Sequence, residues 1–457
     1  MIRTTLLAAA AALLLAPPAA AQSQQETLDA RYDRALAAGY KALFLCSALG
    51  SDPLGLRRDE QSVMRWELRG IQQPLDAIVQ TLEHRIERGS DGALDYVAVP
   101  FANDMPPRVA AFRASQGCSL LPIGAAPPAG EIPPAVLIDR VGDPTVYPLR
   151  AAHRREAMRV AATALGETYG EDARTTAVLI RKGDRTVGEA FAPGFDAHVP
   201  QRTWSVAKSI AATIVGAAVQ RGEADVNASA GLGEDDTDPR RAITIDHLLR
   251  MASGRYSDTP GNRTDPLYFG GSTVAETALH WPLVNPPGST FRYANNDTLA
   301  AIMAIKPALE EHPPVSLFTR LGMHMTTAET DWQGDYILSS QVWTNAADLA
   351  RFGQLYLNDG LWRGERVLPE GWREYVSSPA GPQPEGARFG YGAGFWLLNN
   401  SEGVPPDTFA AFGNRGQYVV IVPSRDVVIV RRGEDPAGGS GFDIAAFTRD
   451  VLAALPN

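Results

Sequence analysis

The sequence predicts an α/β protein, of the α+β kind, in which one antiparallel sheet packs beside a helical lobe. Two segments with strand character, Thr176–Arg181 and Thr186–Phe191, flank the turn Lys182-Gly183-Asp184. A second pair, Tyr418–Val422 and Val427–Arg432, is dense in Val and Ile. Helix-rich and loop-rich sequence separates the two hairpins. Strands at both ends with helices between them predict one sheet built from the two ends, with a site between sheet and lobe.

The chain begins with a segment typical of an export signal. Arg3 is followed by the apolar run Leu6–Ala16, and Ala19-Ala20-Ala21 offers a cleavage site of the A-x-A type. No later stretch is long and apolar enough to span a membrane. We therefore expect residues 1–21 to be a signal peptide. The mature protein is expected to be exported, to the periplasm or the extracellular space, with no integral membrane segment.

Residues 22–150 are predicted to form an N-terminal extension that is partly helical. Apolar residues recur every four positions near its start, which is typical of an amphipathic helix: Leu28, Tyr32, Leu36, Tyr40 and Phe44. A second helix is expected within Leu75–Ile86. The segment Pro122–Pro134 carries many Pro, Gly and Ala residues and predicts a loop or linker before a domain of residues 151–457.

Composition argues against several classes of function. The net charge is −10 and no long basic run occurs, so nucleic acid is not an expected partner. The seven histidines are scattered, with no H-E-x-x-H and no metal-type Cys/His spacing, so we expect neither a metal nor a cofactor. The two cysteines, Cys46 and Cys118, would most simply form one disulfide in an oxidising compartment. The alternative is a pair of buried free thiols.

The candidate reactive centre lies at Trp204–Ser209, which contains a Ser-x-x-Lys. The run Val206–Val219 is apolar on all faces, as expected of a helix inside a core, and it stops at Arg221-Gly222. Ser205 would therefore start a buried helix, where free N–H groups favour developing negative charge. Lys208 lies three residues on, so its side chain shares a face with Ser205.

Lysine usage sharpens this interpretation. Among 42 Lys and Arg residues only four are lysines: Lys41, Lys182, Lys208 and Lys306. An arginine could not act as a base, whereas desolvation disfavours the ammonium of a buried lysine. We expect a Ser205 nucleophile with Lys208 as its base. The alternative is a chance Ser-x-x-Lys whose lysine reaches solvent along an apolar stem.

A second candidate motif follows the turn Asn285–Gly288. Tyr293 and Asn295 are two residues apart on a short extended piece, so their side chains would point the same way. A phenol can relay a proton, and an amide can orient a substrate carbonyl or the lysine. The alternative is a packing tyrosine and a turn asparagine.

With Ala411-Phe412-Gly413 and the following Asn414, these motifs resemble the serine β-lactamases and penicillin-recognising enzymes, particularly the class C β-lactamase-like branch. Within it, the 6-aminohexanoate-dimer hydrolase-like serine hydrolases are the most similar. The resemblance runs from about residue 151 to the end of the chain. It implies a β-lactamase/transpeptidase-like fold and a serine hydrolase. It also implies roles in substrate or oxyanion binding for three residues near the nucleophile: Asn295, Gly413 and Asn414.

One departure from the family pattern bears on the substrate. Ala411 stands where these enzymes carry a lysine, and Phe412 replaces a hydroxyl residue. In β-lactamases that cation receives the antibiotic's carboxylate, and Arg415 is the nearest candidate to replace it here. We expect a hydrolase that cleaves a small amide or ester through an acyl-enzyme on Ser205, with Tyr293 as proton relay. The alternatives are a penicillin-binding-like protein, a D-amino-acid peptidase or a non-catalytic binder of cell-wall fragments.

Overall fold

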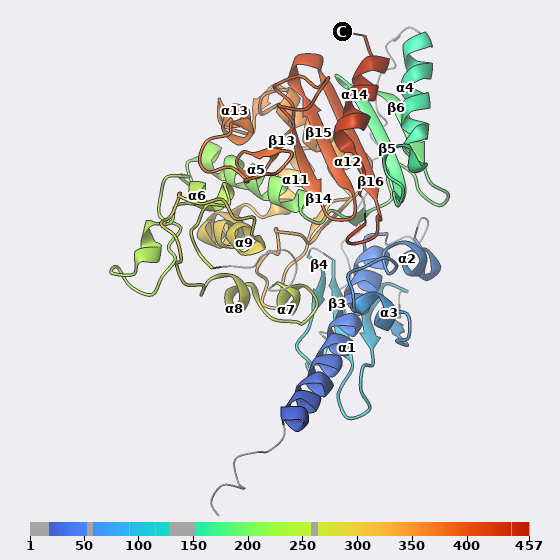
Figure 1. The fold of residues 1–457 in the computed structure, drawn as a ribbon, viewed down its shortest axis with the longest axis vertical. Coiled ribbons are helices and arrows are strands. Elements are labelled where there is room, and N and C mark those ends of the chain that lie inside the picture. The colour runs from blue at the N-terminus through green and yellow to red at the C-terminus, as the bar shows by residue number, and fades with distance from the viewer. Residues whose placement is uncertain are drawn as a thin grey trace, which may run out of the picture.

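A computed structural model describes residues 18–52, 58–90, 92–114, 116–127, 151–256, 264–439 and 441–456 (Figure 1). The expected signal peptide, residues 1–21, lies outside these ranges except for the backbone of 18–21. The expected boundary at residue 150 also lies outside them. Among the described residues, no helix combines the length and the apolar character that crossing a membrane requires.

The largest sheet has seven antiparallel strands in the order β12-β13-β14-β15-β16-β5-β6. Its core is the direct pairing of the two ends of the domain, with Val430 of β16 opposite Leu179 of β5. The predicted joining of the two hairpins is therefore confirmed. The strands are β5 (Thr175–Lys182), β6 (Arg185–Phe191), β12 (Gly390–Tyr391), β13 (Trp396–Leu397), β14 (Phe409–Gly413), β15 (Gln417–Val422) and β16 (Val427–Gly433).

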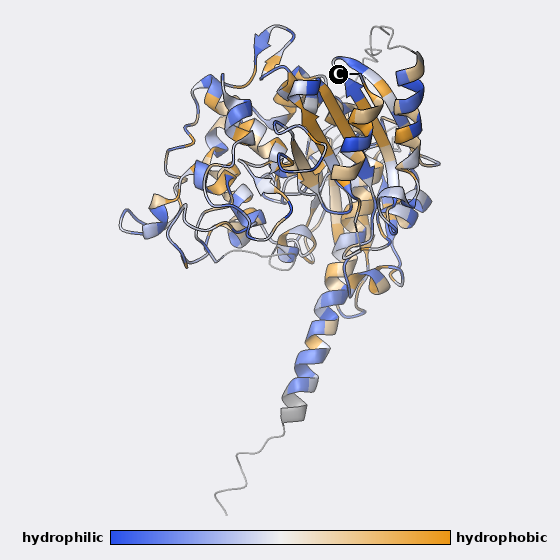
Figure 2. Cartoon of the chain, turned by 45° about the horizontal axis from the view of Figure 1, so that its top comes forward, coloured by the Kyte–Doolittle hydropathy of each residue, from blue (hydrophilic) through white to orange (hydrophobic). Residues whose placement is uncertain are grey.

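Helices cover both faces of this sheet, and the side chains alternate to match. Val420 and Val422 point into a core with α4 (Ala151–Thr163) and α14 (Ile444–Ala454), whereas Val419 points into a core with α5 (Val206–Arg221) and α12 (Ala346–Leu357). The strands are accordingly apolar along their length, as Figure 2 shows by their orange colour. The nucleophile-bearing helix α5 is thus held inside a core.

The remaining elements between β6 and β12 form the helical lobe and two small sheets. In the small sheet β7-β9-β8, β9 pairs with β7, and β7 leads into the turn before α5. These elements are β7 (Gln201–Arg202), α6 (Ile245–Leu249), α7 (Asp265–Tyr268), α8 (Val274–Ala278), α9 (Asn295–Ala304), α10 (Lys306–Glu311), α11 (Pro314–Arg320), β8 (Thr327–Ala328), β9 (Val342–Thr344), β10 (Leu361–Trp362), β11 (Glu365–Arg366) and α13 (Trp372–Ser377).

In the N-terminal region a helix packs against a sheet. The sequence predicted the helix but not the sheet. The sheet has the order β1-β2-β3-β4 and packs on α1. The predicted second helix spans Leu75–Val79, and the carbonyls of Val79 and Leu82 accept hydrogen bonds from the buried Lys41 amine. The elements are α1 (Pro18–Gly50), α2 (Glu60–Trp66), α3 (Leu75–Val79), β1 (Arg85–Arg88), β2 (Leu94–Val99), β3 (Arg108–Arg113) and β4 (Gly117–Leu120).

The two cysteines form the expected disulfide. Cys46 of α1 is bonded to Cys118 of β4 across a sequence separation of 72, with their Cα atoms 6.0 Å apart. Both residues are fully buried, and because they are bonded to each other the alternative of buried free thiols is excluded. The bond ties the helix to the far strand of its sheet.

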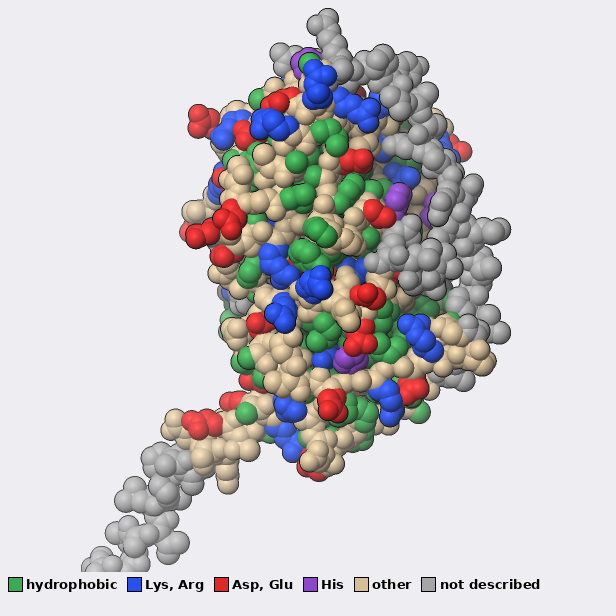
Figure 3. All heavy atoms as spheres, turned by 90° about the vertical axis from the view of Figure 1, so that its right-hand side faces the viewer, with side chains coloured by type: hydrophobic (Ala, Val, Ile, Leu, Met, Phe, Trp, Pro, Cys, Tyr) green, Lys and Arg blue, Asp and Glu red, His purple; other side chains and the backbone are tan. Residues whose placement is uncertain are grey.

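The surface carries both signs of charge. On the face shown in Figure 3, Lys and Arg side chains alternate with Asp and Glu, and no area of a single sign dominates it. The excess of acidic residues in the chain is therefore not gathered on this face.

Candidate active site

Ser205 lies in a sharp turn between β7 and α5. Trp204, immediately before it, has a φ of 51°, an unusual value for a bulky residue. Ser205 is the N-cap of α5, and its carbonyl accepts the N–H of Lys208 at 3.0 Å. The left-handed residue reverses the chain so that the serine stands at the helix start. Such a conformation persists only where its surroundings hold it in place.

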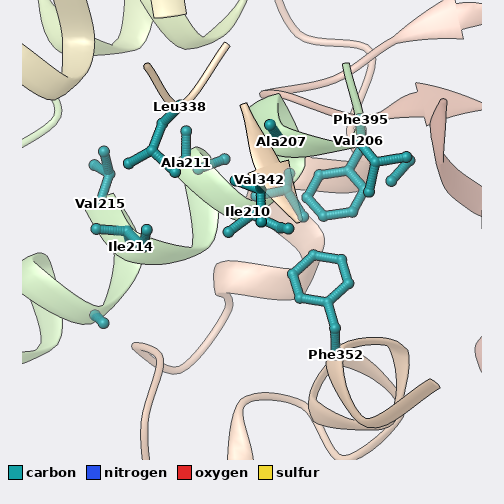
Figure 4. Close-up of a cluster of buried hydrophobic side chains, with 14 of the residues drawn as sticks. Val206, Ala207, Ile210, Ala211, Ile214, Val215, Leu338, Val342, Phe352 and Phe395 are labelled. Carbon is teal, nitrogen blue, oxygen red and sulfur yellow. The ribbon is translucent and has the colours of Figure 1, made fainter. Parts of the chain in front are cut away.

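The helix that follows is fixed by apolar contacts on every side. Figure 4 shows Val206, Ala207, Ile210, Ala211, Ile214 and Val215 of α5 among Leu338, Val342, Phe352 and Phe395. Because α5 is enclosed on all sides, its first turn cannot rotate away from the residues that face it.

Lys208 is buried, with 1% of its surface exposed, so the alternative of a solvent-reaching side chain is excluded. Its Nζ lies 3.0 Å from Ser205 Oγ, 2.6 Å from Asn295 Oδ1 and 2.9 Å from the carbonyl oxygen of Ser339. These three groups are uncharged. A neutral amine can donate to two of them, the amide and carbonyl oxygens, and present its lone pair to the serine hydroxyl.

Tyr293 and Asn295 reach the same amine from the start of α9. The Lys208 Nζ lies 4.9 Å from the centre of the Tyr293 ring. The Asn295 amide donates to Thr264 Oγ1 at 2.8 Å, which turns its oxygen toward the lysine. The piece is held in place because the Arg292 N–H donates to the carbonyl of Met251 at 2.7 Å. The sequence-predicted trio of Ser205, Lys208 and Tyr293 is therefore brought together.

The end of β14 lies against the start of α5. A Cβ built on Gly413 would lie 2.3 Å from the Thr203 carbonyl oxygen and 3.2 Å from the Val206 nitrogen, so only glycine fits there. Among the described residues, the N–H groups of Ser205 and Asn414 donate to no backbone carbonyl. Two such donors at one edge could hold an oxyanion. The Asn414 side chain is exposed and accepts from the Arg415 N–H.

Arg415 does not supply the missing cation of the third motif, which corrects the expectation from sequence. Its side chain is 3% exposed and turns toward the N-terminal region, where it donates to the carbonyls of Trp66 and Glu67. It is ion-paired with Glu434 at 2.9 Å. Ala411 is fully buried. The motif strand therefore presents no cation to Ser205.

Sequence reasoning missed two groups of this site. One is the main-chain carbonyl of Ser339, and the other is the Thr264 hydroxyl that orients Asn295. A main-chain acceptor leaves no trace in residue type, and Thr264 resembles any other N-terminal residue of a short helix. His247 has a structural role, since its Nδ1 accepts the Thr244 N–H in a capping box.

A cluster of potential metal ligands occurs elsewhere. Glu223, Glu311 and His312 have ligand atoms within 4.8 Å of one another, and all three are exposed. Glu223 is already bound to Arg221 at 2.7 Å. The cluster lies beyond the C-terminal end of α5, whereas Ser205 lies at its N-terminal end.

Comparisons with known proteins agree with the fold. The family model described as Beta-lactamase matches residues 161–433, which is more than half of the chain. A 6-aminohexanoate-dimer hydrolase of Paenarthrobacter ureafaciens is 26% identical over 333 residues, covering 66% of this chain and 82% of that protein.

Two solved structures show the same fold. A provisionally named 6-aminohexanoate-dimer hydrolase from Bacillus anthracis has a TM-score of 0.51 and 22% identity, covering 61% of this chain and 78% of its own. EstCE1, described as a hydrolase with promiscuous acyltransferase activity, has a TM-score of 0.50 and 16% identity, covering 66% of this chain and 98% of its own.

Proposed function

Because the chain belongs to the β-lactamase family and is a serine hydrolase, we propose that it cleaves a small amide or ester through an acyl-enzyme on Ser205. The observation that carries the proposal is the 3.0 Å contact between Ser205 Oγ and the buried Nζ of Lys208. Lys208 is buried, and burial disfavours the ammonium form of a lysine. A neutral Lys208 is suited to take the serine proton.

In the proposed acylation, Lys208 accepts the proton of Ser205 while Oγ attacks the carbonyl carbon. The N–H groups of Ser205 and Asn414 hold the oxyanion, each worth about 3 kcal/mol in the transition state. Gly413 lets β14 approach the start of α5 closely enough for both N–H groups to reach one oxyanion. Tyr293 passes a proton to the leaving amine or alkoxide, and Asn295 holds the lysine and orients the substrate carbonyl.

In the proposed deacylation, water takes the place of the leaving group. The Tyr293–Lys208 pair accepts a proton from this water, and the resulting hydroxide attacks the acyl carbon. The serine oxygen leaves with a proton from Lys208, which restores the resting state. The same two groups thus act as base and then as acid in each half of the cycle.

Ser205→Ala tests the assignment directly. We expect turnover of an activated ester to be lost and a fluorophosphonate probe to leave the protein unlabelled, while the unfolding transition is unchanged. Ser209→Ala, one turn further along α5, is the matched control and should keep both activity and label. Labelling of the Ser205→Ala protein would refute the acyl-enzyme.

The amide arm of the proposal is supported by the similarity to a 6-aminohexanoate-dimer hydrolase. Penicillin-binding, D-amino-acid peptidase and non-catalytic roles remain alternatives, and a fluorescent penicillin separates them. Stable labelling of Ser205 would indicate a penicillin-binding role, and the absence of any reaction would indicate a binder. The lack of a cation on the third-motif strand favours turnover of an uncharged substrate instead.

We further propose that the mature protein is exported, with residues 22–150 as an extension of the hydrolase domain 151–457. The buried disulfide supports an oxidising compartment, since such bonds are rare in the cytosol. Mass spectrometry of protein recovered from its native cell would test this. An N-terminus before residue 22 would contradict removal of a signal peptide.

A further inference from the structure

A row of three aromatic rings runs from the candidate active site across the edge of the large sheet. The rings of Tyr293 and Trp396 have centroids 5.5 Å apart, and those of Trp396 and Phe412 are 5.8 Å apart and nearly parallel, at 18°. All three residues are half-buried. We call these three residues the aromatic row.

The strand register explains why the rings line up. Trp396 of β13 lies opposite Ala410 of β14, and Phe412 is two residues further along β14 on the same face. Tyr391 supports the row from the side: its ring and that of Trp396 have centroids 5.0 Å apart and lie nearly perpendicular, at 87°. The row is therefore a rigid feature of the sheet and not a chance contact between loops.

The Tyr293 end of the row contacts a reactive group, and the backbone beside its Phe412 end lies against the turn that carries Ser205. At one end, the Tyr293 ring stands over the Lys208 amine, which lies 3.0 Å from Ser205 Oγ. At the other end, Phe412 is followed by Gly413, which lies against the Thr203 carbonyl at the start of the Ser205 turn. A group attached to a carbonyl bound at Ser205 would therefore lie along these rings.

The surroundings of the row disfavour a carboxylate. Ala411 and Arg415 offer no cation, as described above. Arg388 lies near the far end, 5.2 Å from the Phe389 ring, but it is ion-paired with Asp443 at 3.0 Å. The faces of aromatic rings carry negative partial charge, which repels a carboxylate and suits the edge or face of another ring.

We propose that the aromatic row is the substrate-binding subsite and that it takes a planar, uncharged aromatic substituent of the ester or amide. This inference rests on the proposed function, because the subsite is defined by its place beside Ser205. It adds Trp396 and Phe412 as residues that determine specificity without taking part in the chemistry.

The test compares matched esters by titration of the acid released. Methyl phenylacetate carries the ring on the acyl side and benzyl acetate on the alcohol side. Cyclohexyl analogues of each provide a non-planar partner, and monomethyl glutarate provides a carboxylate. The acyl-side pair and the alcohol-side pair are the two arms of the test. In one of them we expect the aryl ester to have a higher kcat/KM than its cyclohexyl partner, and we expect monomethyl glutarate to be the poorest substrate. The arm that shows the preference identifies the side of the scissile bond that the row receives.

Trp396→Leu and Phe412→Leu should each lower kcat/KM for the preferred aryl ester by about tenfold, the upper end of what an aromatic pair contributes. The loss should be smaller for the cyclohexyl partner, so that the preference for the aryl ester narrows. Phe389→Leu is the matched control: its ring lies 5.3 Å from Phe412 but has no such contact with Trp396 or Tyr293. It should keep the aryl preference.

Three results would overturn the inference. The first is equal kcat/KM for aryl and cyclohexyl esters in both arms. The second is an equal loss in Phe389→Leu, because the row would then act only through packing. In both of these cases, labelling of Ser205 and turnover of methyl acetate would still support the hydrolase assignment. The third, no labelling and no turnover of any ester, would remove the proposed function and the subsite together.

Discussion

The two regions that flank Ser205 both bury basic side chains, and they surround them differently. On one side lies the proposed catalytic pocket around Lys208. On the other lies the domain seam, where residues of the N-terminal region and the hydrolase region pack together: Phe44, Arg202, Trp204, Trp343 and Arg415. In the pocket the buried basic residue is a lysine, whereas in the seam the buried basic residues are arginines.

Arg202 shows how the seam holds a charge. Its guanidinium lies 4.3 Å from the centre of the Trp204 ring and 5.1 Å from that of Phe44, and it donates to Ser340 Oγ at 2.8 Å. Burial lowers the pKa of Arg202, yet a guanidinium keeps its proton in proteins. The comparison teaches that the arginines of the seam fix the shape around Ser205, whereas the proposed chemistry requires a lysine at position 208, where a proton must move.

Exchange of the pocket lysine should have the largest effect. Lys208→Arg replaces the proposed neutral base with a guanidinium that keeps its proton, so we expect turnover of an activated ester to fall by about a thousandfold. Lys41→Arg is the matched control, because Lys41 is equally buried and donates only to the carbonyls of Val79 and Leu82. Its folded fraction should turn over at the original rate. Comparable losses in the two variants would erase the distinction between pocket and seam.

Removal of the disulfide should act on stability alone. The double variant Cys46→Ala/Cys118→Ala releases a loop with a sequence separation of 72, which in the chain-entropy model lowers the unfolding free energy by about 4 kcal/mol. Urea unfolding of the oxidised proteins measures this. The folded double variant should keep its turnover rate, because neither cysteine contacts the pocket. An unchanged unfolding midpoint would show that the bond does not constrain the unfolded chain.

The seam also predicts a dependence of stability on pH. Burial raises the pKa of Glu329, whose carboxylate accepts the Cys118 N–H, from 4.5 to about 7. Between these values the folded protein holds a proton that the unfolded chain has lost, so stability falls as pH rises from about 4.5 to about 7. Unfolding measured at pH 5 and pH 8 should differ by up to about 3 kcal/mol from this group.

Glu329→Gln isolates the contribution of Glu329 to this pH dependence of stability, because glutamine keeps an acceptor for the Cys118 N–H and does not titrate. The variant should be more stable than the original protein at pH 8, and its unfolding free energy should fall less between pH 5 and pH 8. Some fall should remain, since burial likewise raises the pKa of Glu67 to about 7. An equally steep fall in the variant would contradict the assignment to Glu329.

The smallest expected effect comes from the ring that crosses the seam. Phe44→Leu removes aromatic contacts with Trp204 and Trp343, each at 5.8 Å between centroids, and should lower the unfolding free energy by about 1 to 2 kcal/mol. The kcat of the folded protein should barely change. A fall in kcat close to that of Lys208→Arg would show that the seam and the pocket act as one unit.

The sequence was sufficient for the parts of the fold that depend on strong local patterns. The Val-rich strands of β15 and β16, the apolar helix α5 and its glycine cap are written in consecutive residues. The sheet of β1–β4 was not predicted, because strands such as Arg85–Arg88 are short and mostly charged. Arg85–Arg88 is a strand through its pairing with β2, and β2 packs on α1.

The candidate site also has features that the sequence predicted and features that it did not. Residue types and spacing predicted that Ser205, Lys208 and Tyr293 would meet. They could not predict the direction of the Arg415 side chain, which is set by carbonyls of Trp66 and Glu67 some 350 positions away. Nor could they predict the carbonyl of Ser339, since any residue type offers one.

The pairing of β5 with β16 has a consequence for how the molecule is made. Arg431 of β16 donates to the Thr175 hydroxyl of β5 across 256 positions, so the middle of the sheet closes only when the last tenth of the chain is available. At 5–20 residues per second, the nascent β5–β6 hairpin waits roughly 10 to 50 seconds with an apolar edge uncovered. A ribosome that stalls before Val427 releases a chain with an open edge strand, which is a template for aggregation and a target for chaperones.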